Sequence, residues 1–253
     1  MIAKRLLTSV ILLTFCLISG RVWAVDGNAL FMEMAETLAR AQQFSVIIHM
    51  SYDSVQDSGQ KIEFSELRKV IIQRPNNLRV DALQSDGDQS GLIFDGKTIT
   101  LFSKTENVYS CTSHPGNIDA TIRYAGGEMG IRIPLARMLV TNLPQELGKM
   151  VTKVEYVEKD TLQEPLDHIA VRSQDVDLQA WIAEDKLPHR IILTYKNAPG
   201  QPQFRAEFTN WNMSPKIPSE TFKFTPPKGA EKIPTLLPLS QLQSGQTKKG
   251  GAK

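Results

Sequence analysis

Apolar and polar residues alternate along most of this chain. From Phe44 to Tyr52 the apolar residues Phe44, Val46, Ile48, Met50 and Tyr52 alternate with mainly polar ones. A period of two predicts a β-strand with one apolar face. Similar runs predict strands at residues 61–74, 78–82, 92–94, 98–102 and 108–111, and again at 152–158, 167–173, 176–183, 189–195 and 203–213. The links are short, and Asp95-Gly96 is a strong hairpin signal. We therefore expect two antiparallel meanders.

Two other segments have the period of a helix. Residues 28–43 carry apolar side chains at helical spacing, with Asn28 as the expected N-cap. The second segment, between the two meanders, predicts a helix over 118–125 that Asn117 caps.

Beyond residue 125, Gly126 and Gly127 are expected to end that helix. Pro134 suits the first turn of another helix over 135–141. The insert formed by residues 117–141 is the most apolar segment outside the strands. Two interpretations stay open for it, ordinary core packing or a lid over an apolar cavity.

The first 24 residues are organised like a secretory signal peptide. Two basic residues precede an apolar stretch over residues 6–20, and small residues lead to an expected cut between Ala24 and Val25. An uncleaved anchor is disfavoured because polar residues dilute the apolar run. Lipid attachment at Cys16 is disfavoured because a bulky residue precedes it.

We therefore expect a signal peptide at 1–24, a single domain at 25–233 and a disordered tail at 234–253, with no transmembrane segment after cleavage. Three of the 29 basic residues lie in the signal segment, which leaves 26 basic and 27 acidic residues. A nearly neutral chain gives no reason to expect a nucleic-acid partner. Cys111 is the one cysteine left, so no intramolecular disulfide can form.

The sequence carries no recognisable catalytic or metal-binding motif. Its four histidines are His49, His114, His168 and His189, and none has metal-ligand spacing. The chain also lacks HExxH, CxxC and GxSxG motifs, a P-loop and a dinucleotide-binding turn. Acidic residues on separate strands could still meet, so an enzyme remains a third hypothesis. We expect no catalysis, no metal and no cofactor.

Several stretches together resemble the predicted periplasmic proteins of domain of unknown function 2092. The resemblance covers about residues 28–233. It is carried by residues 94–98, 118–119, 130–136, 176–182, 188–196, 199–204, 208–212 and 222–230. Two departures are Gly126-Gly127, where relatives usually continue a helix, and Thr141-Asn142-Leu143, which replaces a more acidic segment.

That family is similar in plan to the lipoprotein carrier and receptor proteins LolA and LolB. The resemblance implies an α+β, mainly β fold: a curved antiparallel sheet, or open half-barrel, with helices on its concave face. It also implies a non-catalytic periplasmic carrier whose cavity holds a lipid, an acyl chain or another apolar group. The expected partners are a lipid or lipidated protein and an envelope protein.

The alternative is an envelope scaffold or protein-interaction domain with a filled core and no small ligand. For the carrier, the strand alternation and the apolar insert predict the cavity lining. The predicted lining is Val46, Ile48, Met50, Phe64, Val80, Phe94, Leu101, Met129 and Ile133.

Overall fold

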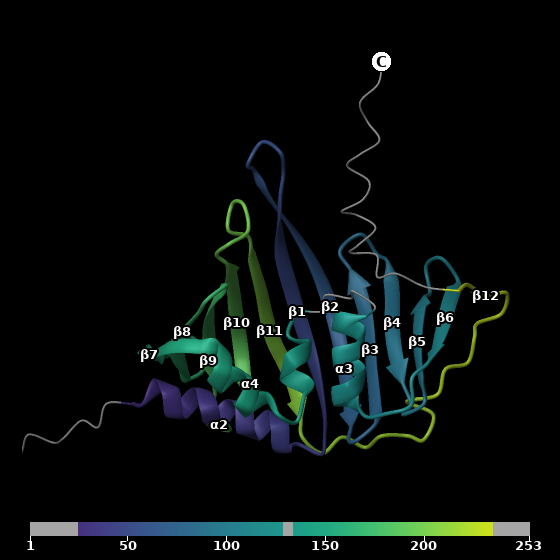
Figure 1. Ribbon diagram of the computed structural model, residues 1–253, viewed down its shortest axis with the longest axis horizontal. Coiled ribbons are helices and arrows are strands. Elements are labelled where there is room, and N and C mark those ends of the chain that lie inside the picture. The colour runs from purple at the N-terminus through teal and green to yellow at the C-terminus, as the bar shows by residue number, and fades with distance from the viewer. Residues whose placement is uncertain (1–24, 129–133, 235–253) are drawn as a thin grey trace, which may run out of the picture.

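A computed structural model of the chain describes residues 25–128 and 134–234. Within them, twelve strands form one open sheet in the order β12-β6-β5-β4-β3-β2-β1-β11-β10-β9-β8-β7. The sheet curves around the helices, which lie on its concave side (Figure 1). The expected fold class, mainly β with helices covering a curved antiparallel sheet, is confirmed. The predicted Met129 and Ile133 lie outside the described residues.

Each predicted meander forms one half of the sheet. The first contains β1 (Gln43–Val55), β2 (Lys61–Gln73), β3 (Asn77–Gln84), β4 (Gln89–Phe94), β5 (Thr98–Ser103) and β6 (Val108–Ser113). The second contains β7 (Val151–Asp160), β8 (Leu166–Ser173), β9 (Val176–Ile182), β10 (Pro188–Tyr195) and β11 (Gln203–Asn212). The two halves meet where β1 pairs antiparallel with β11.

The register keeps the apolar residues of neighbouring strands on one face. Val46 on β1 pairs with Val70 on β2, which pairs with Val80 on β3. Val80 in turn pairs with Leu92 on β4, and Leu92 with Leu101 on β5. Directly opposed residues share a face of a sheet. We call the face that carries this row the inner face, and the opposite one the outer face.

A bulge in β11 changes which residues reach the inner face. The β1–β11 register shifts between Ser45 and Ile47, and Asn210 has a positive φ of 55°. The extra residue offsets the alternation by one. Trp211 therefore stacks on Phe208, with ring centroids 5.7 Å apart.

Four helical segments cover the inner face: α2 (Gly27–Arg40), α3 (Ile118–Gly127), the 3₁₀ helix η2 (Ala136–Leu139) and α4 (Leu143–Met150). Asp26, and not Asn28, caps α2, since its side chain accepts hydrogen bonds from two backbone N–H groups. Asn117 caps α3 as expected. None of the helices in the described residues is long and apolar enough to span a membrane.

One expectation for the insert was wrong, and one helix that follows the insert was not predicted. The helix α3 continues through Gly126 and Gly127, because neither residue needs a left-handed backbone and nothing crowds their positions. The segment after η2 forms α4, a helix that was not expected from the sequence. Pro144 in its first turn and Leu143 and Leu147 on one face were the available signals.

The chain beyond β11 crosses the outer face and closes one edge of the sheet. Phe224 packs against Phe102 and Tyr109, with ring centroids 5.4 and 5.1 Å apart. The short strand β12 (Glu231–Lys232) then pairs in parallel with β6. This carboxy-terminal segment covers apolar residues of the outer face, such as Phe102, that would otherwise face water.

Candidate functional site

A cavity of about 1320 Å³ lies between the inner face of the first meander and the helices α3, η2 and α4. Binding pockets for small molecules usually enclose roughly 300–1,000 Å³, so this space is large even for a ligand site. Its floor comes from β1 to β6, and its cover comes from the three helical segments. The second meander contributes Tyr195, Phe208 and Trp211.

The floor changes from apolar to polar along the strands. The apolar row from Val46 to Leu101 crosses five strands. The next row outward contains Ile48, Arg68, Ala82, Ser90 and Ser103, each paired with the one before it. The row beyond that pairs Met50 with Glu66 and Glu66 with Gln84. All of these residues line the cavity, which is therefore apolar at one end and polar at the other.

A salt bridge occupies the polar end of the floor. Arg68 donates two hydrogen bonds to the carboxylate of Glu66, from Nε and from Nη2. The two side chains are 20% and 12% exposed, so the pair is largely shielded from water. A bidentate pair of this kind is well oriented and leaves neither charge free.

The covering helices are fastened to each other and to the sheet through Asp119 on α3. Its carboxylate accepts hydrogen bonds from the backbone N–H and the hydroxyl of Thr141, just after η2. It also lies 3.8 Å from a guanidinium nitrogen of Arg74, at the end of β2. Burial lowers the pKa of Arg74, and the charge of Asp119 opposes that effect. The contacts hold the cover in place over the cavity.

Four of the residues that α3 presents to the cavity are small and leave room above the floor. The residues that α3 presents to the cavity are Thr121, Ile122, Arg123, Ala125, Gly126 and Gly127. Thr121 is 2% exposed, and its hydroxyl has no hydrogen-bond partner. Buried polar groups in proteins are nearly always paired, so an unpartnered hydroxyl in a cavity wall is an available donor.

Most of the predicted lining residues that the structure describes lie together in the cavity wall. Val46, Ile48, Met50, Val80 and Leu101 all line the cavity. The other two predicted residues that the structure describes, Phe64 and Phe94, lie on the inner face but do not line the cavity.

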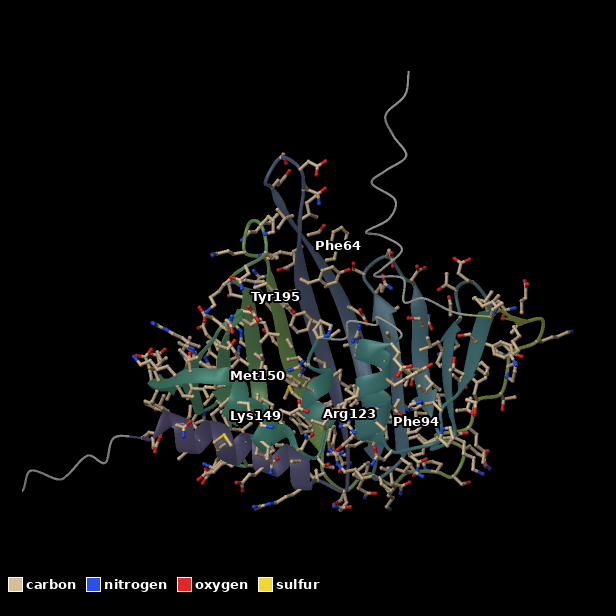
Figure 2. All side chains as sticks on the ribbon, in the orientation of Figure 1. Phe64, Phe94, Arg123, Lys149, Met150 and Tyr195 are labelled. Carbon is tan, nitrogen blue, oxygen red and sulfur yellow. The ribbon has the colours of Figure 1, made fainter. Side chains whose placement is uncertain are left out.

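Those two residues occupy opposite ends of their strands. Phe94 is fully buried at the apolar end and lies 6.5 Å from the His114 ring. Phe64 is 38% exposed and stacks on Tyr52 at the far end of the β1–β2 hairpin. Figure 2 shows Phe64 far from the helices that cover the cavity.

Lining residues that the sequence did not reveal come from two parts of the chain. Phe208 and Trp211 reach the cavity because β11 joins β1, a pairing that the two separate meanders did not reveal. Because of the bulge at Asn210, an alternation with a period of two does not place Trp211 on the inner face. Met138, Leu139 and Met150 come from the short helices that follow α3.

Among its described residues, the cavity lining holds the carboxylates of Glu66, Glu106 and Glu146 but no histidine or cysteine. His168 stacks on Trp181 on the outer face, and His189 bonds to Glu164. Within residues 25–128 and 134–234, no cluster of three or more histidine, cysteine, aspartate or glutamate side chains could hold a metal ion.

Solved structures with a similar architecture share little sequence with this chain. An uncharacterized conserved protein from Thermus thermophilus has 9% identity and a TM-score of 0.48, over 82% of this chain and 99% of that one. The MucB structure in a Pseudomonas aeruginosa MucA/MucB complex has 15% identity and a TM-score of 0.43, over 79% of this chain and 62% of that one. A LolA superfamily protein from Nitrosomonas europaea has 9% identity and a TM-score of 0.38, over 79% of this chain and 99% of that one.

None of these likenesses carries residue roles or ligands over to this chain. No curated protein matches the sequence. A family model, in contrast, matches residues 27–236, nearly the whole described part of the chain. The protein therefore belongs to the family described as predicted periplasmic protein (DUF2092).

Proposed function

We propose that this protein is a non-catalytic periplasmic carrier that holds an acyl chain of a lipid or lipidated protein in the cavity. The observation that carries the proposal is an apolar row across five strands beneath a cover of helices, enclosing about 1320 Å³. The lining residues that hold the chain are then Val46, Ile48, Met50, Val80 and Leu101.

The apolar floor supplies the driving force for binding. Each buried methylene contributes about 0.8 kcal/mol, so ten of them contribute about 8 kcal/mol. Association itself costs roughly 4–15 kcal/mol. Short chains should therefore bind weakly, and affinity should rise steeply with chain length until the cavity is full.

Location in the periplasm supports a lipid cargo. The family description is periplasmic, and we propose that residues 1–24 are a signal peptide cut between Ala24 and Val25. Acyl chains cannot cross an aqueous compartment unprotected, because exposing their surface to water is costly. The amino-terminal residue of protein purified from a periplasmic extract tests this step, with Val25 expected.

The alternative, a scaffold with a filled core, predicts a packed interior. The space above the first meander favours the carrier over that alternative. We expect an envelope protein to donate or receive the cargo, because a carrier needs a source and a destination.

Native mass spectrometry of protein purified from the periplasm without detergent tests the function. We expect bound lipid, and uptake of saturated alcohols of increasing length by protein stripped of it. Two added methylenes should improve affinity about tenfold. Protein that is ligand-free after purification and takes up none of the alcohols would contradict the proposal.

A further inference from the structure

We infer that the ligand is an anionic amphiphile, whose acidic head group is bound by Arg123, Arg137 and Lys149 while its chain occupies the apolar end of the cavity. The inference rests on the proposed function and deepens it, because it assigns a chemical class to the head group. It concerns the charge on the helical cover, which the apolar floor does not explain.

The three cations belong to three helical segments, and the middle one contacts the other two. Arg123 lies on α3, Arg137 on η2 and Lys149 on α4, and η2 contacts both other segments. Arg137 places a guanidinium nitrogen 2.9 Å from the sulfur of Met150, the residue after Lys149. All three side chains line the cavity and are exposed. Figure 2 shows Arg123 and Lys149 on the neighbouring helices α3 and α4 that cover the sheet.

The described charged residues of the lining carry a small excess of positive charge. Among the residues that the structure describes, seven in the lining are charged: Arg68, Arg123, Arg137, Lys149, Glu66, Glu106 and Glu146. Arg68 and Glu66 neutralise each other in their bidentate pair. No acidic group in the described part of the chain lies within 4.0 Å of the charged nitrogens of Arg123, Arg137 or Lys149. The unpaired lining residues are thus three cations and two acids.

The arrangement suits a single charged head better than a wholly apolar ligand. The cations come from the cover, on the solvent side of the cavity, whereas the apolar row lies on the floor below. A chain on that floor would leave its head beside the cover. An anion there gains from several cations at once, and its attraction weakens as salt is added.

Three ligands with the same twelve-carbon chain separate the head group from the chain. Dodecyl phosphate, dodecanol and dodecyltrimethylammonium would be compared as competitors of a fluorescent fatty acid at low ionic strength. We expect dodecyl phosphate to bind about tenfold more tightly than dodecanol. The cationic amphiphile should bind most weakly, and 0.5 M salt should reduce the preference for the anion.

A triple variant, R123Q/R137Q/K149Q, should lose the preference for dodecyl phosphate and keep the affinity for dodecanol. The matched control K69Q/K97Q/K216Q removes the same charge from exposed lysines outside the lining, and should keep the preference. Circular dichroism would establish that both variants fold. Inorganic phosphate alone should not compete, because it has no chain.

The two proposals fail in distinguishable ways. If none of the three amphiphiles binds, the carrier function itself is wrong. If dodecanol and dodecyl phosphate bind equally to the wild-type protein, the carrier function stands and the head-group inference is overturned. An anion preference that survives in R123Q/R137Q/K149Q, or is lost in the control, would also overturn it.

Discussion

The two halves of the inner face have the same alternating pattern but different covers. Over the second meander, α2 presents Leu30, Phe31 and Met34, which are buried in the same core cluster as Ile169, Val171, Ala180, Ile182 and Ile191, whereas Leu38 of α2 also lines the cavity. Over the first meander, α3 presents Thr121, Ala125 and two glycines together with the larger Ile122 and Arg123, and a large cavity remains. The strands alone therefore do not decide whether a half is packed or open. The helices above them decide it, through their side chains and their position over the sheet.

The largest expected difference between the halves is the cost of removing a buried side chain. Phe31→Ala should lower the free energy of unfolding by about 3–5 kcal/mol, because it leaves a void in a filled region. Leu101→Ala should cost only about 1–2 kcal/mol, because Leu101 already borders the cavity and has fewer packing partners to lose. Urea unfolding of both variants measures the loss in free energy of unfolding. Equal losses in the two variants would refute the contrast in packing between the halves.

Glycine substitutions should have opposite signs in the two halves. A Cβ on Gly27 of α2 would lie 2.7 Å from the backbone nitrogen of Tyr156, whereas a Cβ on Gly126 of α3 would meet nothing within 4 Å. Gly27→Ala should therefore destabilise the protein by about 1–3 kcal/mol. Gly126→Ala should stabilise it by about 0.5–1 kcal/mol by restricting the unfolded chain. Thermal unfolding tests both, and a stabilising Gly27→Ala would contradict the close packing of α2.

The junction of the halves should make stability depend on pH. Asp53 on β1 accepts hydrogen bonds from Arg205 and from the backbone N–H of Gln203, both on β11. Burial by itself would raise the pKa of Asp53, but these hydrogen bonds and the charge of Arg205 lower the pKa overall. A lowered pKa in the folded state means that the stabilisation is present above the unfolded value near 3.8 and is lost as the pH falls below it.

Asp53→Asn should cost about 1 kcal/mol at pH 7 and flatten the loss of stability between pH 5 and about pH 2. Urea unfolding across this range measures both effects. Asp57→Asn, in the exposed turn of the same hairpin, is the control and should leave the profile unchanged. A wild-type profile in Asp53→Asn would show that the junction does not depend on this charge.

The smallest expected effect concerns two buried threonines. Thr121→Val removes a hydroxyl that has no partner, so stability should stay the same or rise by up to about 1 kcal/mol. Thr100→Val on the outer face removes a hydroxyl that contacts Cys111 Sγ at 3.6 Å, and should cost about 0.5 kcal/mol. Chemical denaturation measures the free energy of unfolding of both variants. A clear loss of stability in Thr121→Val would mean that the Thr121 hydroxyl has a hydrogen-bond partner in solution.

The sequence predicted the sheet well because each strand has its own local period. The alternation within β1, β3 and β5 places five of the predicted lining residues on the face that borders the cavity, since the register carries one strand's pattern to the next. It did not reveal the β1–β11 pairing, which joins residues about 160 positions apart, or the bulge at Asn210. It also missed α4, whose eight residues offer little periodicity.

The volume of the cavity could not be predicted either. It depends on how far α3 stands from the sheet, which is set by contacts such as that between Asp119 and Thr141. Those two residues lie 22 positions apart, and neither belongs to a recognisable motif. Periodicity identifies which face is apolar, but the packing of separate elements determines whether that face is filled.

One measurement tests the central claim, that the open half of the inner face is a binding cavity, most directly. Ala82 lines the cavity, and its neighbour Leu83 is 42% exposed on the outer face of the same strand. The affinity of the wild-type protein, Ala82→Trp and Leu83→Trp for a fluorescent fatty acid would be measured by titration. We expect Ala82→Trp to weaken binding about tenfold or more by filling the cavity, and Leu83→Trp to bind like the wild type. Unchanged affinity in a folded Ala82→Trp variant would contradict the account.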